Sequence, residues 1–186
     1  MKIFIDQGHN PQNPNAGAEG NGLREQDITY EVGVMLAELL RENGNFQVML
    51  SRNSPTEQLG TSNATSLAAR VNAANAWGAQ YFISLHCNAS TNTSASGSEC
   101  YVYAENTPAY WLGEQILVGL NAATGLRTRG MFIRPSLYVL RRTNMPAVLV
   151  EMGYISNPGD AELMGSRPDL FARGIYNGML TYFDLA

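Results

Sequence analysis

MKIFIDQGHNP, residues 1–11, is the stretch that decides the fold. Its apolar run Ile3–Ile5 is typical of a buried strand, and the strand ends where the chain turns before His9. A second apolar run, Tyr81–Leu85 in YFISLHCNAS, also ends at a histidine, His86. These are the only two histidines of the chain. The sequence therefore places an imidazole at the end of each of two predicted strands.

Further apolar runs alternate with stretches of helical periodicity. The predicted strands are Lys2–Asp6, Phe46–Ser51, Tyr81–His86, Ser98–Tyr103, Leu137–Leu140 and Ala147–Glu151. The predicted helices are Gln26–Asn43, Ser66–Trp77, Pro108–Ala123 and Asp169–Phe183. Gly44 suits the end of the first helix and Thr107 the start of the third. This alternation predicts an α/β fold with a mostly parallel sheet flanked by helices, because crossover helices join parallel strands.

Length and composition limit the classes of protein to consider. With 186 residues, we expect a single domain over residues 1–186, and 45% hydrophobic with 15% charged residues indicates a globular chain. A net charge of -4 argues against nucleic acid as a partner. We find neither a membrane span nor a signal peptide in this chain, and we expect the protein to be secreted or released by lysis. The spacing of Cys87 and Cys100 leaves a disulfide between them open, and the oligomeric state is not specified.

Three polar side chains are expected to meet at one edge of the sheet. Ligands of open α/β sheets bind at the carboxyl ends of the strands. His9, His86 and Glu151 each follow or end a predicted strand, so we expect them at that edge. The turn-rich segments 10–22 and 88–97 are expected to form loops around it.

Imidazole and carboxylate groups in this arrangement indicate a metal site. Catalytic zinc commonly has three protein ligands, drawn from histidine and carboxylate side chains, and one open position. His9 and His86 supply two ligands, and we predict Glu25, just before the first long helix, as the third. Proton transfer needs another group nearby, and Glu151 is our candidate general acid or base.

Each of these residues also has a structural interpretation. A histidine after a strand can serve only as a hydrogen-bonded structural residue, and Glu25 can simply favour the first turn of a helix through the helix dipole. A buried Glu151 must find partners, and an arginine could pair with it. The candidates for that ion pair are Arg52, Arg70, Arg141 and Arg142.

Three further polar residues adjoin the candidate ligands. Asp6 either orients a ligand histidine or caps the turn. Asn88 either contacts the substrate or satisfies a turn, and we retain it as a candidate substrate-binding residue. A cysteine hydrolase built on Cys87 and His86 is disfavoured, because adjacent strand residues point to opposite faces.

Several blocks spread over the whole chain resemble one known family. They include IDQGHNPQNPNAGAEGNGLRE, AARVNAANAWGAQYFISLHCNAS, GSECYVY and LYVLRRTNMPAVLVEMGYISN. In this order and spacing they resemble the zinc-dependent N-acetylmuramoyl-L-alanine amidases of the Amidase_3 type. The resemblance implies a mixed six-stranded sheet, zinc held by His9, Glu25 and His86, and a catalytic Glu151. Tyr154 stands where the motif around that glutamate usually has phenylalanine.

The same resemblance implies a reaction and a substrate. Such amidases hydrolyse the amide between the lactyl group of N-acetylmuramic acid and L-alanine of the peptidoglycan stem peptide. The family includes autolysins, sporulation hydrolases and phage endolysins, so we expect the protein to act on the cell wall. Two alternatives stay open: a zinc peptidase that cuts within the stem, and a non-catalytic module that binds muropeptides.

Overall fold

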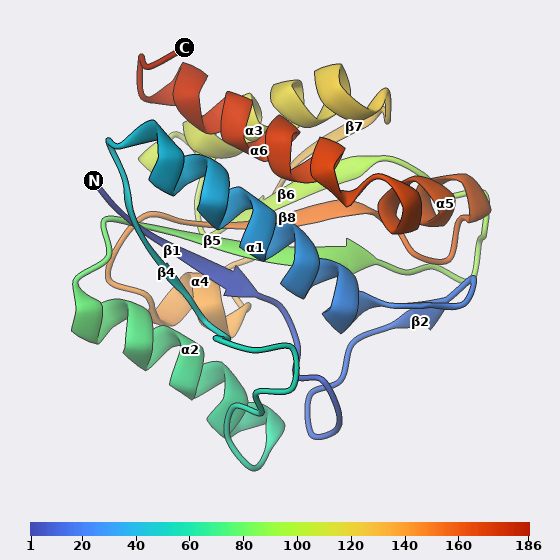
Figure 1. The fold of residues 1–186 in the computed structure, drawn as a ribbon, viewed down its shortest axis with the longest axis horizontal. Helices are drawn as coiled ribbons and strands as arrows, with labels where there is room; N and C mark the ends of the chain where they lie inside the picture. Colours follow the sequence, from blue (N-terminus) through green and yellow to red (C-terminus); the bar gives the residue numbers. More distant parts are fainter.

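A six-stranded sheet runs through the centre of the protein, with helices on both faces (Figure 1). The computed structural model describes residues Met1–Ala186. The strands of the sheet are β1 (Lys2–Gln7), β4 (Gln47–Leu50), β5 (Tyr81–Asn88), β6 (Ser98–Val102), β7 (Thr128–Ile133) and β8 (Ala147–Tyr154). Their order is β4-β1-β5-β8-β6-β7, and only the β6–β8 pairing is antiparallel. The predicted α/β fold with a mostly parallel sheet of about six strands is confirmed.

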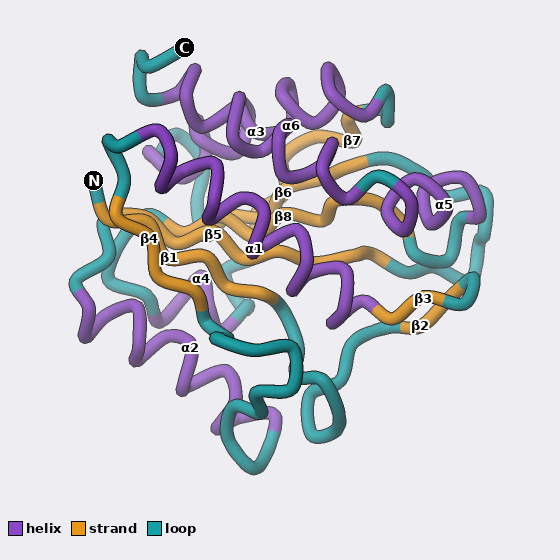
Figure 2. The backbone as a smooth tube through the Cα atoms, in the orientation of Figure 1, coloured by secondary structure: helices purple, strands orange, loops and turns teal.

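Helices lie on both faces of the sheet (Figure 2), and the two faces carry cores of unequal size. The helices are α1 (Glu25–Asn43), α2 (Asn63–Trp77), α3 (Pro108–Thr124), α4 (Tyr138–Arg142), α5 (Pro158–Ser166) and α6 (Pro168–Tyr182). A cluster of 27 buried residues joins one face to α1, α3 and α6, whereas a cluster of 9 joins the other face to α2 and α4. The second face is therefore the less covered one. None of the helices combines the length and apolar character that crossing a membrane requires.

Helix ends follow the capping residues of the sequence. The Thr107 hydroxyl accepts a hydrogen bond from the backbone N–H of Tyr110 at the start of α3, as predicted. Ser62 caps α2 in the same way, four residues before Ser66, the predicted start of that helix. Gly44 ends α1 in the left-handed conformation with φ 79°, which glycine adopts without steric cost.

The structure corrects the strand prediction for Leu137–Leu140. These residues lead into the short helix α4, where Val139 and Leu140 are buried in the smaller core. A run of four apolar residues fits either a strand or a buried helical turn, and here packing against the sheet selects the helix.

Three elements were not predicted. Strand β7 forms the sheet edge, and helix α5 starts where the Asn157 side chain accepts hydrogen bonds from Gly159 and Asp160. A two-stranded hairpin, β2 (Glu19–Gly20) with β3 (Leu23–Arg24), lies at the end of the predicted loop 10–22. The sequence signals of these elements are short or polar and lack a clear period.

A buried ion pair fixes the end of β1. Arg70 of α2 donates from Nη1 to Asp6 Oδ1 at 2.6 Å, and the Ser84 hydroxyl donates to Asp6 Oδ2 at 2.8 Å. The Arg70 guanidinium also donates to the backbone oxygens of Gln7 and His9, both at 2.6 Å. Asp6 thus neither orients a histidine nor caps the turn; it anchors the arginine that holds the turn in place.

Replacement of Asp6 by asparagine should destabilise the protein in a pH-dependent way. Burial alone would raise the pKa of Asp6, but Arg70 and the Ser84 hydroxyl lower it below its ordinary 3.8. The ionised pair therefore contributes full stability above pH 3.8, and this contribution is lost as the pH falls through the lower folded-state pKa. We expect Asp6→Asn to cost about 3–5 kcal/mol at neutral pH, because the buried Arg70 loses its partner.

Urea unfolding of both proteins, from neutral pH to about pH 2, measures this effect. The difference in unfolding free energy should shrink in acid. A difference that stays constant over the whole range would contradict the assigned ion pair.

Candidate active site

Three side chains from distant parts of the chain converge beyond the carboxyl ends of β1 and β5. His9 follows β1, Glu25 begins α1, and His86 lies near the end of β5. One potential ligand atom from each lies within 4.8 Å of the other two. Glu25 Oε1 is 3.2 Å from His9 Nε2 and 3.0 Å from His86 Nδ1. The structure thus brings together the three residues that the sequence nominated, and their role as metal ligands stays a prediction.

Glycines permit this close approach. A Cβ atom at Gly8 would lie 2.4 Å from the backbone oxygen of Leu85 and 2.6 Å from Cε1 of His86. A Cβ atom at Gly17 would lie 2.8 Å from Glu25 Oε2. His9 itself adopts a left-handed conformation with φ 69°, which costs energy for a residue other than glycine. The hydrogen bond from Arg70 to the His9 backbone oxygen holds this conformation.

The donor set fits a divalent ion better than a purely structural arrangement. Neither imidazole bonds to any protein group except Glu25, and His9 Nδ1 is buried without a partner. Zinc–ligand distances of about 2.0–2.2 Å in a tetrahedral site place neighbouring ligand atoms roughly 3.3–3.6 Å apart. The spacings of 3.2 and 3.0 Å around Glu25 Oε1 are close to that geometry.

Backbone amides orient the Glu25 carboxylate. Oε1 accepts a hydrogen bond from the N–H of Cys87 and Oε2 accepts one from the N–H of Ala18, both at 2.9 Å. Burial by itself would raise the pKa of Glu25, but the hydrogen bonds from His86 and His9 hold it far below its ordinary value. The carboxylate is therefore ionised, as a metal ligand must be.

Glu151 lies on β8 directly beside His86. The two residues are register partners in the parallel β5–β8 pair, so their side chains share one face of the sheet. Glu151 forms no ion pair, and its Oε2 is buried without a hydrogen-bond partner. Burial, followed by the charges of Glu25 and Glu99, raises the pKa of Glu151 well above its ordinary value. Such a carboxyl group can hold a proton near neutral pH.

The arginines considered as partners of Glu151 are engaged elsewhere or exposed. Arg70 pairs with Asp6, and Arg52 donates to the backbone oxygen of Gln26 at 2.7 Å. Arg141 and Arg142 are exposed at the end of α4. The simple ion-pair interpretation of Glu151 is therefore wrong.

A second buried carboxylate, Glu99 of β6, was missed by the sequence analysis. It faces Glu151 as its register partner in the antiparallel β6–β8 pair. Its oxygens accept hydrogen bonds from Asn88 Nδ2 at 2.6 Å, from Arg129 Nε at 2.8 Å and from the Tyr101 hydroxyl. The signal for this residue was a glutamate inside a predicted buried strand, a position at which a carboxylate needs partners.

Asn88 and the two cysteines take structural positions. The side chain of Asn88 donates to Glu99, and its Oδ1 accepts from the N–H of Ala89 at 2.9 Å. A role of Asn88 in substrate binding stays a prediction. Cys87 and Cys100 are free and buried in the larger core, and burial raises the pKa of the Cys87 thiol well above its ordinary value. Cys87 is therefore a poor nucleophile.

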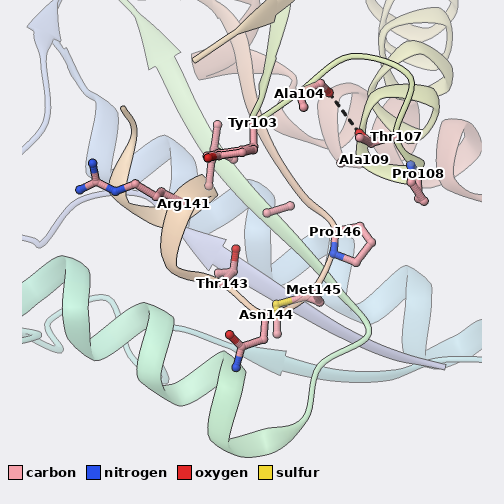
Figure 3. A pocket seen from close by; sticks show the side chains of 12 residues that line it. Tyr103, Ala104, Thr107, Pro108, Ala109, Arg141, Thr143, Asn144, Met145 and Pro146 are labelled. Carbon is pink, nitrogen blue, oxygen red and sulfur yellow. Dashed lines mark hydrogen bonds between the residues drawn. The ribbon is translucent and has the colours of Figure 1, made fainter. Parts of the chain in front are cut away.

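Two hollows lie on the less covered face. A cavity of about 130 Å³ adjoins His9 and His86 and is walled by Leu67, Tyr138 and Leu149 among others. A hollow of about 390 Å³ lies at the other end of β8, where Tyr103, Pro108 and Pro146 surround it (Figure 3). Of the candidate metal ligands, His9 and His86 border the first hollow and none borders the second.

Comparisons with known proteins agree with this geometry. A sequence profile of the Amidase_3 family, described as N-acetylmuramoyl-L-alanine amidase, matches residues 3–181. N-acetylmuramoyl-L-alanine amidase CwlM of Bacillus licheniformis is 39% identical over 100% of this chain and 70% of its own length. The sporulation-specific N-acetylmuramoyl-L-alanine amidase of Bacillus subtilis is 35% identical over 100% of this chain and 69% of its own length.

Solved structures show the same fold. The catalytic domain of CwlV, an N-acetylmuramoyl-L-alanine amidase from Bacillus (Paenibacillus) polymyxa var. colistinus, superposes with a TM-score of 0.85 at 28% identity. The alignment covers 100% of this chain and 99% of CwlV. An N-acetylmuramoyl-L-alanine amidase from Clostridium difficile 630 gives 0.87 at 29% identity, covering 99% of this chain and 97% of that one. The chain belongs to the N-acetylmuramoyl-L-alanine amidase family.

Metal binding should depend on the three converging side chains. We expect the protein to bind one zinc ion, and His86→Ala to weaken binding by at least about 100-fold, because one of three ligands is lost. Isothermal titration with zinc, after dialysis against a chelator, measures the affinity. Asn88→Ala, two residues along the same strand, is the matched control and should bind zinc normally. Equal affinity of His86→Ala and the unaltered protein would contradict the assigned site.

Proposed function

We propose that the protein is a zinc-dependent amidase of peptidoglycan. The bond cleaved joins the lactyl carbonyl of N-acetylmuramic acid to the nitrogen of L-alanine in the stem peptide. The observation that carries the proposal is the juxtaposition of the His9–Glu25–His86 cluster with the protonatable Glu151 on the next strand. Membership of the amidase family supports the choice of bond and substrate.

His9, Glu25 and His86 would hold the metal. A zinc ion bound there supplies a Lewis acid that polarises the carbonyl and lowers the pKa of water. The protein keeps this ligand set in shape through the Arg70 contact to the His9 backbone and the amide contacts to Glu25. These contacts position the ligands before substrate arrives, which reduces the reorganisation needed during the reaction.

Glu151 would transfer the proton. It takes a proton from the attacking water and gives it to the nitrogen of L-alanine as the carbon–nitrogen bond breaks. The oxygen of water stays on the lactyl carbon, so the products are a glycan with a lactyl carboxylate and a peptide with a free L-alanine amine. The raised pKa of Glu151 suits the second half of this role, because a carboxylate that binds a proton strongly accepts it from water and holds it until the nitrogen takes it.

The cell wall is the expected place of action. One relative is the sporulation-specific N-acetylmuramoyl-L-alanine amidase of Bacillus subtilis, and another is an endolysin of Bacillus phage SPP1. Peptidoglycan is therefore the partner that we infer for this chain.

Loss of the Glu151 carboxyl group should abolish turnover. Glu151→Gln retains the shape of the side chain but cannot exchange a proton, so we expect cleavage of purified peptidoglycan to fall by roughly 100- to 10,000-fold. Zinc affinity should stay normal. The matched control is Glu38→Gln on the exposed face of α1, which should retain full activity.

Mass analysis of the soluble products, with and without a chelator, tests the reaction itself. We expect released peptides that begin with L-alanine, and no release in chelator. Peptides with new D-amino-acid termini would indicate a peptidase instead. Binding of muropeptides without any cleavage at saturating zinc would indicate a binding module.

A further inference from the structure

Two arginines lie side by side at the start of β7, Arg127 just before the strand and Arg129 within it. Arg127 Nε and Arg129 Nη1 both donate to the backbone oxygen of Ser96, at 3.1 and 3.5 Å. Their stems pass over Gly97, where an added Cβ would lie 2.7 Å from Arg127 Cγ and 3.3 Å from Arg129 Cγ. The missing side chain at Gly97 therefore allows the two guanidinium groups to come together.

A β-bulge directs Arg129 toward the active site. Ser98 pairs with Thr128 and Glu99 pairs with Gly130, so Arg129 is the extra residue on β7. Gly130 at φ 108° accommodates this irregularity. Bulges of this kind often re-aim a side chain beside an active site. Here Arg129 reaches Glu99, which faces Glu151 on the next strand.

Arg129 is held rigidly but is not covered. Its Nε donates to Glu99 Oε2 at 2.8 Å, and its guanidinium carbon lies 5.1 Å from the centre of the Tyr154 ring. Its side chain is nevertheless 28% exposed, and its Nη2 donates to no protein group. A guanidinium group fixed in this way loses little freedom when it binds a ligand.

The two carboxylates nearest to the arginines are buried and already accept hydrogen bonds from the protein. The groups that remain available to a ligand are therefore guanidinium N–H groups. Glu99 is buried and accepts hydrogen bonds from several donors. Asp160 is also buried and accepts from the Ser96 hydroxyl and from the N–H groups of Gly97 and Tyr154. Arg127 forms no ion pair and is exposed. The pair of arginines thus offers unused donors in the geometry that carboxylates prefer.

The position of these donors matches the path of the peptide in the proposed reaction. In the proposed reaction Glu151 delivers a proton to the L-alanine nitrogen, so the stem peptide would leave on the β8 side of the metal ligands. In the path that we infer, it runs from there toward β6 and β7. Two strand spacings separate Glu151 from β7, about 10 Å. An extended chain covers about 3.3–3.6 Å per residue, so a carboxylate on the second stem residue lies roughly 7 Å from the scissile nitrogen. The Arg129 side chain spans the remaining distance, because its Nε reaches Glu99 on β6, the strand next to β8.

We propose that Arg127 and Arg129 form a subsite that binds a free carboxylate on the second residue of the stem peptide. The inference rests on the proposed amidase function. It makes the protein selective for stems in which that carboxylate is free over stems in which it is amidated. The glycan side of the substrate carries no such group, so the subsite also sets the orientation of the substrate.

Two synthetic muropeptides that differ only at this group test the proposal. One carries a carboxylate on the second stem residue and the other a carboxamide, and kcat/KM is measured for each with the zinc-loaded enzyme. We expect the unaltered protein to prefer the acid by about tenfold or more, mainly through KM. Arg127→Gln and Arg129→Lys should each move the ratio toward one, because a donor or the planar fork is lost.

The matched control is Arg142→Gln, at an exposed arginine that ends α4 and whose side chain has no hydrogen bond or ion pair. It makes the same charge change and should retain the preference. Circular dichroism checks the fold of Arg129→Lys. If Arg129→Lys is unstable, Arg127→Gln, at an exposed position, tests the subsite by itself. A ratio near one in the unaltered protein, or an unchanged ratio in Arg127→Gln, would overturn the subsite while the amidase function stands. Failure to cleave either muropeptide would overturn both.

Discussion

The buried Glu25 carboxylate is the group on which the rest of the site depends. A charge taken out of water must be compensated by nearby donors or cations. Here Oε1 faces both histidine rings and accepts the Cys87 amide, while Oε2 accepts the Ala18 amide. The same carboxylate therefore ties the start of α1 to the ends of β1 and β5, and it draws two imidazoles to one point. We propose that a divalent cation at that point completes the compensation.

The pairing of the strands places further polar side chains in a row beside the Glu25 cluster. His86, Glu151 and Glu99 are successive register partners on β5, β8 and β6. Bulges then adjust the edges of this row, with one between His86 and Asn88 and one at Arg129. The row lies on the face of the sheet where only α2 and α4 pack, and it leads from the candidate metal ligands toward β7. Fold and chemistry are linked through strand register.

The sequence predicts those parts of the structure that have a strong local pattern of residues. Long periodic helices, buried strands and the residues at strand ends could be predicted, and so could the meeting of His9, Glu25 and His86. The helix at Tyr138–Arg142 could not, because a four-residue apolar run has no distinguishing period. The environment of Glu151 could not either. Glu99 and Arg129 reach it only through an antiparallel pairing and a bulge, and neither of these leaves a period in the sequence.

Anomalous diffraction at the zinc absorption edge, from crystals grown with zinc, tests the central claim most directly. The account predicts one strong peak about 2.0–2.2 Å from His9 Nε2, Glu25 Oε1 and His86 Nδ1. It also predicts that the Glu151 carboxyl group faces the remaining coordination position. A fully occupied zinc ion bound elsewhere, with the three side chains still bonded only to one another, would contradict it.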